Sequence, residues 1–168
     1  MPQELLKEMV EEHGKAVYRL ALRYTGDGHL AEDIAQETFL RACAGLHGYD
    51  RSRPAGPWLL RIALNLCRNR RRSAREIPME EKIRAAEADP GPGPEHIYLR
   101  RERERELAEV LHALPLKYRE VLILKHVNEL SYAEIGAVLG LRLSLVKNRL
   151  YRGRIMLREA LQKGEYNQ

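Results

Sequence analysis

The sequence predicts an all-α protein made of two small helical domains joined by a Pro/Gly-rich linker. Its 168 residues are 44% hydrophobic but only 6% aromatic, so the cores must depend on Leu, Ile, Val and Ala, which suit helices. No sustained alternation of β-branched and polar residues, the pattern of a strand, is present. The run DPGPGP at residues 89–94 can sustain neither a helix nor a sheet ladder.

The chain divides into three segments. We expect a first helical domain over residues 1–75, a linker over 76–96 and a second helical domain over 97–168.

Short signals mark the helix ends inside the two domains. Gly26 separates the first two helices, and Pro57 stands in the first turn of the third. Pro115 separates two later helices. Ser131 and Glu134 have the spacing of a capping box, which predicts that a helix begins after Ser131.

Composition narrows the class of protein. The net charge is +5, and the bases gather at residues 61–75 and 142–158, a distribution that permits nucleic-acid binding. Cys43 and Cys67 fit no metal spacing, and we expect both to be buried small hydrophobes. Because no signal peptide and no apolar run near 18 residues is present, we expect a cytoplasmic protein without membrane insertion. No residue pattern indicates a metal or a cofactor.

Residues 130–157 read as two short amphipathic helices joined by a tight turn at Gly140. In the second helix an apolar stripe recurs at helical spacing and must face the preceding helix. The stripe consists of Val146, Leu150, Gly153 and Leu157, opposite Ile135, Val138 and Leu139. The outward and flanking positions carry Ser144, Lys147, Asn148, Arg149, Tyr151, Arg152 and Arg154. This is the pattern of a helix-turn-helix that reads duplex DNA, although a structural helix pair with a solvated basic face would share it.

A second basic helix follows Trp58. We expect Trp58, Leu59, Ile62 and Leu66 to face the core. The opposite side carries Arg61, Arg68, Arg72 and Arg75, with Arg71 nearby and with Asn65 and Asn69 bordering the row. A row of guanidinium groups without intervening acids favours phosphate binding, whereas a merely solubilising surface normally mixes charges. The polar loop before this helix, residues 47–57, could hold an unstacked base.

The helix predicted over residues 29–44 is acidic. Its core side consists of Ala31, Ile34, Ala35, Thr38 and Ala42. Its outer side carries Asp33, Gln36, Glu37 and Leu40. An outward leucine ringed by acids would be repelled by DNA and suggests a protein-docking face. An ordinary acidic surface with one stray leucine is the alternative.

These three pieces, in this order, resemble the extracytoplasmic-function group (group IV) of the sigma-70 family of bacterial RNA polymerase sigma factors. The motifs are AEDIAQETFLRA at residues 31–42, WLLRIALN at 58–65 with RRR at 70–72, and LPLKYREVLILKHVNELSYAEIGAVLG at 114–140 with VKNRLYRGR at 146–154. They span nearly the whole chain.

The resemblance implies a sigma-2 domain followed by a sigma-4 domain, and a role as an alternative sigma factor. The outer side of the acidic helix, Asp33 to Leu40, would dock on the polymerase clamp. The loop 47–57 and the helix 58–75 would bind the melted minus-10 element, with Asn65 and Asn69 near the captured bases. The helix 144–154 would read the minus-35 element as duplex.

The implied partners are core RNA polymerase, through its clamp and flap, together with promoter DNA and an anti-sigma factor. Apolar residues of 118–124 would help to contact the flap. The chain departs from the family where Asn69 replaces a common Asp, and where Arg142 and Leu145 replace a small capping residue and a Thr. We expect Ser144 to take over the cap and Leu145 to be partly exposed.

Two other functions compete with this interpretation. A plain helix-turn-helix regulator would explain the second domain, but it would leave the basic helix and the outward Leu40 unexplained. A nucleic-acid enzyme would need paired carboxylates, a Gly-rich phosphate loop, a Ser/His/Asp group or zinc spacing, and none is convincing. The sequence therefore favours a promoter-recognition subunit that is not an enzyme.

Overall fold

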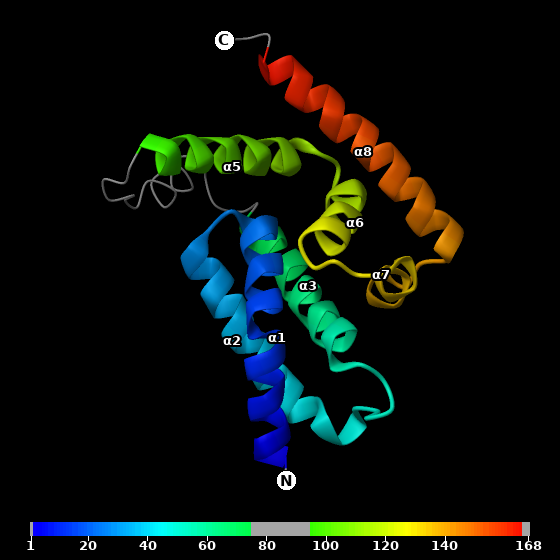
Figure 1. The fold of residues 1–168 in the computed structure, drawn as a ribbon. Helices are drawn as coiled ribbons and strands as arrows, with labels where there is room; N and C mark the ends of the chain where they lie inside the picture. Colours follow the sequence, from blue (N-terminus) through cyan, green and yellow to red (C-terminus); the bar gives the residue numbers. More distant parts are fainter. Residues whose placement is uncertain (1, 75–94, 166–168) are drawn as a thin grey trace.

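The computed structural model describes residues 2–74 and 95–165, and within these ranges all regular structure is helical (Figure 1). The first unit consists of α1 (Pro2–Thr25), α2 (Gly28–Gly45), the 3-10 helix η1 (Leu46–Gly48) and α3 (Ala55–Ala74). The second consists of α5 (Glu95–Ala113), α6 (Leu116–His126), α7 (Tyr132–Leu139) and α8 (Leu143–Glu165). The predicted all-α class with two helical domains is confirmed. Most of the predicted linker lies outside the described residues, but Glu95 and His96 already belong to α5.

The predicted helix ends follow local signals. Gly26 has a φ of +72° between α1 and α2, and Asp27 then caps α2 by accepting a hydrogen bond of 3.1 Å from the amide of Leu30. The capping box of α7 is complete: Ser131 Oγ accepts from the amide of Glu134, and Glu134 Oε2 accepts from the amide of Ser131.

The core of the first unit lies between α1, α2 and α3. Leu20, Ile34, Leu59 and Leu64 are fully buried there. The predicted core side of α2 is confirmed, with Ala35 half-buried and the other four positions buried. On α3 the prediction holds for Leu59 and Leu66, whereas Trp58 and Ile62 are only half-buried.

Helix α6 is the central helix of the second unit. It packs against α7 and α8 and also against α1 of the first unit. As a result, seven successive residues, Tyr118–Leu124, are buried. A helix covered on all sides cannot offer apolar residues to another protein. The prediction that apolar residues of 118–124 contact the polymerase flap is therefore wrong for this arrangement.

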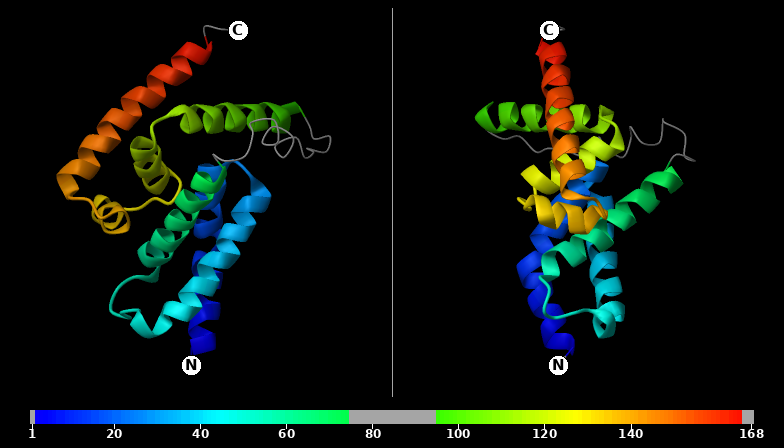
Figure 2. Two further views of the ribbon diagram at one scale, coloured as in Figure 1. Left: turned by 180° about the vertical axis from the view of Figure 1, so that it is seen from behind. Right: turned by 90° about the vertical axis from the view of Figure 1, so that its right-hand side faces the viewer.

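The two units pack directly on each other. Helix α3 lies against α7, and α1 lies against α6, as the two views of the ribbon show (Figures 1 and 2). The amide group of Asn128, just after α6, donates a hydrogen bond of 3.0 Å to the carbonyl oxygen of Ala16 in α1. The buried residues of both units accordingly form one continuous apolar cluster.

The two cysteines differ in exposure. Cys67 is fully buried, and burial raises the pKa of its thiol to about 12. Cys43 is exposed, so the prediction that both are buried is wrong for this residue. It immediately follows the buried Ala42 on α2, and one residue turns the side chain by about 100° around a helix. Among the described helices none is long and apolar enough to cross a membrane.

Replacing Gly153 with alanine is expected to stabilise the protein. Gly153 lies in the interior of α8, where glycine costs about 0.5–1 kcal/mol relative to alanine. A Cβ there would lie 3.4 Å from Leu122 and Tyr118 side-chain atoms, close to ordinary van der Waals contact. Chemical denaturation should therefore show a gain of about 0.5–1 kcal/mol. A loss of stability would mean that the α6–α8 contact has no room for a methyl group.

Candidate nucleic-acid and protein interfaces

Helix α8 presents the predicted polar face outward. Val146 and Leu150 are fully buried against α6 and α7, and Gly153 is buried with them. Ser144, Lys147, Asn148, Tyr151 and Arg152 are exposed, and Arg149 and Arg154 are half-buried on the flanks. The first four turns of α8 thus offer a row of hydrogen-bond donors and cations of the kind that fits a major groove.

The beginning of α8 departs from one expectation. The carbonyl oxygen of Arg142 accepts the first helical hydrogen bonds, from the amides of Leu145 and Val146. Arg142 therefore occupies the capping position, and Ser144 lies inside the first turn rather than capping it. Leu145 is partly exposed, as predicted. Sequence reasoning missed the neighbouring Leu143, which is about half exposed; its place outside the apolar stripe was the available signal.

Helix α3 carries most of its predicted polar row on the surface. Arg61, Asn65 and Asn69 are exposed, and Arg71 is half-buried. The side chain of Arg72 and the whole of Arg75 lie outside the described residues.

Arg68 departs from the expected open row of guanidinium groups. Its Nε donates to Glu120 Oε1 at 2.8 Å, and its Nη2 donates to Glu120 Oε2 at 2.7 Å. This carboxylate comes from α6 of the second unit and is 4% exposed. No acid interrupts the row of guanidinium groups in the sequence of α3. In the folded protein, however, the carboxylate of Glu120 lies against it.

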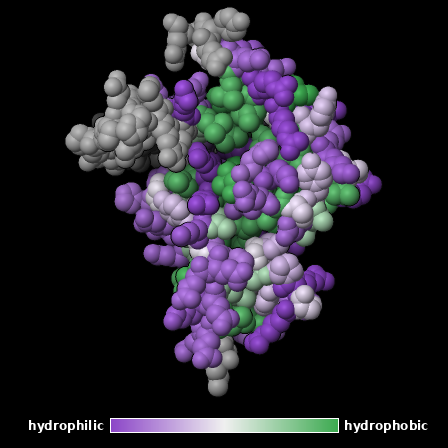
Figure 3. All heavy atoms as spheres, viewed as in Figure 1, coloured by the Kyte–Doolittle hydropathy of each residue, from purple (hydrophilic) through white to green (hydrophobic). Residues whose placement is uncertain are grey.

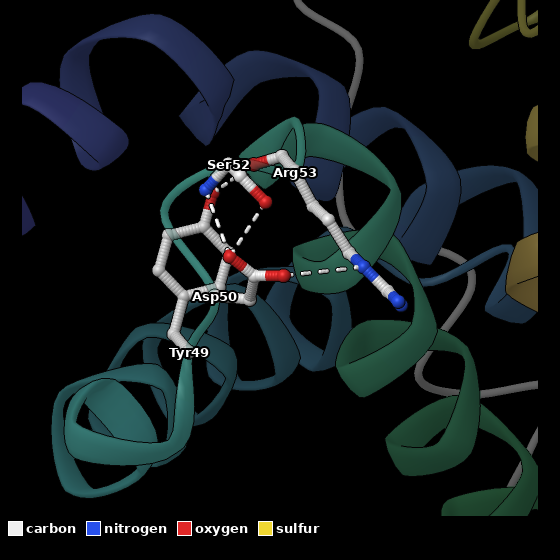
Figure 4. A network of polar contacts seen from close by, with 4 residues as sticks. All are labelled: Tyr49, Asp50, Ser52 and Arg53. Carbon is white, nitrogen blue, oxygen red and sulfur yellow. Dashed lines mark hydrogen bonds and ion pairs between the residues drawn. The ribbon is translucent and has the colours of Figure 1, made fainter.

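The loop before α3 is held in shape by its own polar contacts (Figure 4). Asp50 Oδ1 accepts from the amide and the hydroxyl of Ser52, and Arg53 lies 3.4 Å from Asp50 Oδ2. The hydrogen bonds from Ser52 lower the pKa of Asp50. Tyr49 donates its hydroxyl hydrogen to the carbonyl of Arg53, and its ring stacks on Trp58 with centroids 4.5 Å apart.

A recess lies between this loop and the adjoining helices. Its volume is about 330 Å³, and its lining residues are Arg41, Gly45, Gly48, Trp58, Ile62 and Asn65. It thus combines an aromatic ring, an amide and a guanidinium group. These three groups suit the stacking, hydrogen bonding and phosphate pairing of one nucleotide.

The outer face of α2 has the predicted composition. Leu40 is 66% exposed, and Asp33 and Gln36 are exposed with it. Glu37 is half-buried and accepts a hydrogen bond of 2.7 Å from Arg41 Nε. The outer face of α2 therefore presents one large apolar side chain, Leu40, near carboxylate and amide groups.

A cleft of about 750 Å³ lies between the two units. Basic residues of three helices line it: Arg68 and Arg71 of α3, Lys117 of α6 and Arg149 of α8. Among the described residues that line it, Glu120 is the one carboxylate. The cleft therefore concentrates positive charge from both candidate DNA-binding helices.

Comparisons with known proteins agree with this arrangement. Two family descriptions match: sigma-70 region 2 over residues 9–77 and sigma-70 region 4 over residues 104–157. The ECF RNA polymerase sigma factor SigW of Bacillus subtilis is 35% identical over 95% of this chain and 90% of its own length. The ECF RNA polymerase sigma factor SigE of Mycolicibacterium smegmatis is 40% identical over 93% of this chain, which spans 61% of the length of that relative.

Solved structures show the same fold. CnrH, solved in complex with the cytosolic domain of CnrY, has a TM-score of 0.73 and 29% identity over 96% of this chain and 90% of its own. The sigma factor RpoE of Bartonella quintana, solved with the anti-sigma factor NepR, has a TM-score of 0.72 at 22% identity over 93% of this chain and 96% of its own. The chain therefore belongs to the sigma-70 family of RNA polymerase sigma factors, in its extracytoplasmic-function group, whose members direct transcription initiation at promoters.

Proposed function

We propose that this protein binds core RNA polymerase and recognises promoters at two elements, minus-10 and minus-35. The observation that carries the proposal is the presence, in one chain, of an exposed helix-turn-helix, a separate basic helix and an acidic docking face on the helix before it. Residues 1–75 form the sigma-2 domain in this proposal. The sigma-4 domain begins with α5 at Glu95, which leaves residues 76–94 as the linker. The protein acts in the cytoplasm and catalyses no reaction of its own.

Helix α8 reads the minus-35 element as duplex. The exposed Lys147, Asn148 and Arg152 suit base edges and phosphates of the major groove. The exposed Leu143 and Leu145 at its start suit thymine methyl groups.

Helix α3 and its preceding loop bind the melted minus-10 strand. The recess beside Trp58 takes one unstacked base, whose edge Asn65 reads. Arg61, Asn69 and Arg71 bind along the strand, joined by Arg68 and Arg72. This role of α3 is supported by its net positive charge and by the preformed loop.

The polymerase contacts lie on both units. Asp33, Gln36, Glu37 and Leu40 of α2 dock on the clamp, with Leu40 as the apolar anchor. Because the residues of α6 are buried, we assign the contact with the polymerase flap to the surface between α5 and α8. These two helices carry the half-buried Leu107, Val110 and Leu157, and apolar surface is visible between them in Figure 3.

An anti-sigma factor is the third proposed partner. CnrH was solved in complex with the cytosolic domain of CnrY, and RpoE of Bartonella quintana with the anti-sigma factor NepR. This chain matches CnrH over 96% of its residues in one superposition. That coverage includes both units of this chain, with a TM-score of 0.73.

Co-purification with core RNA polymerase, followed by transcription from a random-promoter library, tests the proposed function. A stoichiometric complex that initiates at a two-element motif is expected. Tight duplex binding by the free protein, without a polymerase complex, would instead identify a plain helix-turn-helix regulator.

Replacing both Arg149 and Arg152 with alanine should weaken binding to the minus-35 element. Each contact to a base or phosphate is worth about 1–3 kcal/mol, so we expect affinity for upstream duplex to fall roughly tenfold or more. Fluorescence anisotropy of holoenzyme on labelled promoter measures this loss. Arg158→Ala, at an exposed position further along α8, is the control. An equal loss of polymerase affinity in the double variant would contradict the groove assignment.

A further inference from the structure

The contact between the two units uses a residue that the proposed minus-10 helix needs. Arg68 of α3 forms a two-point pair with Glu120 of α6, with donor–acceptor distances of 2.8 and 2.7 Å. A guanidinium group binds carboxylate and phosphate through the same planar fork. While Arg68 is paired with Glu120, the edge formed by its Nε and Nη2 is not available to a DNA phosphate.

Glu120 is held firmly in that position. It is 3% exposed, and the hydroxyl of Tyr24 in α1 also points at its Oε1, at 3.4 Å. Both Arg68 and Tyr24 belong to the first unit, whereas Glu120 belongs to the second. The carboxylate therefore bridges the units by accepting hydrogen bonds from two helices.

We propose that Glu120 is an internal competitor of promoter DNA, which holds Arg68 in a closed arrangement of the two units and releases it when they separate. The inference rests on the proposed function of α3 and adds a regulation to it. The docking face of α2 remains exposed in the closed arrangement, with Leu40 66% exposed. The pairing of Arg68 with Glu120 thus restrains DNA binding by α3, and it leaves the α2 surface accessible to polymerase.

The electrostatics of the cleft make Glu120 the controlling group. Arg68, Arg71, Lys117 and Arg149 line the cleft together with Glu120, and no other carboxylate is among the described residues of its lining. Like charges gathered in one cleft repel each other, and Glu120 offsets that repulsion. Without its charge, no other carboxylate among the described lining residues would offset the cations of the two DNA-binding helices in the closed arrangement.

The interface is also suited to opening. A buried ion pair contributes little net stability, because desolvation offsets the attraction and separation rehydrates both groups. The interface also holds a buried polar atom, Oδ1 of Asn128, for which the described residues provide no hydrogen-bond partner. Promoter phosphates can therefore compete with Glu120 for Arg68.

The test measures opening in the free, full-length protein. Cys43 is exposed and Cys67 is buried with a pKa raised to about 12, so a label reacts at Cys43 in the first unit. A second label at Lys163→Cys, exposed near the end of α8, reports on the second unit. Double electron–electron resonance between the two labels then gives the distance distribution. Binding of a mixed-sequence 20-nucleotide single strand, measured by anisotropy, gives the DNA affinity.

Glu120→Gln keeps the shape of the side chain and removes its charge. We expect a dominant short distance with a minor long-distance population in the parent protein, and roughly tenfold more of that long-distance population in Glu120→Gln. Single-strand affinity should rise severalfold. Glu109→Gln, at an exposed position of α5, makes the same change in net charge and should alter neither readout.

The reversed pair Arg68→Glu with Glu120→Arg provides the second test. It restores the attraction between α3 and α6, so the short distance should return while DNA affinity stays low. If Glu120→Gln loses helicity, the distance distribution and the DNA affinity of this charge-reversed variant test the proposal instead.

Three results would overturn the inference. They are an open parent protein, an unchanged distance distribution in Glu120→Gln, or opening without any gain in single-strand affinity. The distance measurement needs no polymerase. Failure of polymerase to co-purify would therefore refute the proposed function, while the contact between the units would be judged separately.

Discussion

Leu40→Arg is expected to abolish co-purification with core RNA polymerase while leaving the protein folded. The side chain is 66% exposed on α2, so an arginine there extends into solvent, and the free energy of unfolding should change by about 0.5 kcal/mol or less. The apolar anchor of the proposed clamp contact is lost. The new cation also lies one turn from Gln36 and Glu37, where it offsets the acidic charge of the face.

The magnitude follows from the energetics of interface anchors. Truncating or charging such a residue typically costs about 2–4 kcal/mol of binding, which lowers affinity roughly 30- to 1,000-fold. Pull-down with core polymerase and a competition assay measure this loss, and circular dichroism checks the fold. Val10→Arg is the matched control, because Val10 is an exposed apolar residue of α1, 43% exposed. If Leu40→Arg formed holoenzyme as well as the parent protein, the docking assignment would be wrong.

Arg119→Met is expected to destabilise the second unit strongly. Arg119 is 2% exposed, and its guanidinium group caps the carboxyl end of α5. Its Nε donates to the carbonyl of Leu111 at 2.7 Å, and its Nη2 donates to the carbonyls of His112 and Leu114. Burial lowers the pKa of Arg119, but an arginine stays protonated at any working pH. The positive charge therefore remains at the negative end of the helix dipole.

Removing this group should lower the free energy of unfolding by about 3 kcal/mol, because buried carbonyls lose a charged donor. In a unit of this size that corresponds to a fall in Tm of roughly 10 °C or more. Thermal and urea denaturation followed by circular dichroism measure the effect. Arg119→Lys keeps the charge without the fork and should be intermediate, whereas Arg103→Met at an exposed position of α5 should be nearly neutral. A loss below about 1 kcal/mol for Arg119→Met would show that water replaces the guanidinium group.

The parts of the fold that sequence reasoning predicted are those with local causes. The capping box at Ser131 and the turn at Gly140 depend on residues within one or two helical turns. The buried stripe through Val146 and Leu150 repeats with the helix period, so its partners can be named without knowing the rest of the fold. The exposed Leu40 followed in the same way from its phase on α2.

The same reasoning failed where burial depends on a distant helix. Tyr118–Leu124 looked like an available apolar surface, because nothing in the sequence shows that α1 of the other unit covers α6. The prediction placed Cys43 on the buried side of α2, whereas the structure buries the preceding residue, Ala42, and exposes Cys43. The capping role of Arg119 had no local signal, since two of its carbonyl partners, Leu111 and His112, belong to the preceding helix.

The sequence by itself therefore determined the helical class, the helix-turn-helix with its outward polar row, and the family to which the chain belongs. These follow from periodicity and capping, which act over a few residues, and from motifs that stand in order along the chain. Only the tertiary structure decided that Arg68 is paired with Glu120, 52 residues away. A sequence does not show how far apart two charged residues lie in the folded protein. The attraction between Arg68 and Glu120 becomes large only because the packing of α3 against the second unit removes water from around the carboxylate.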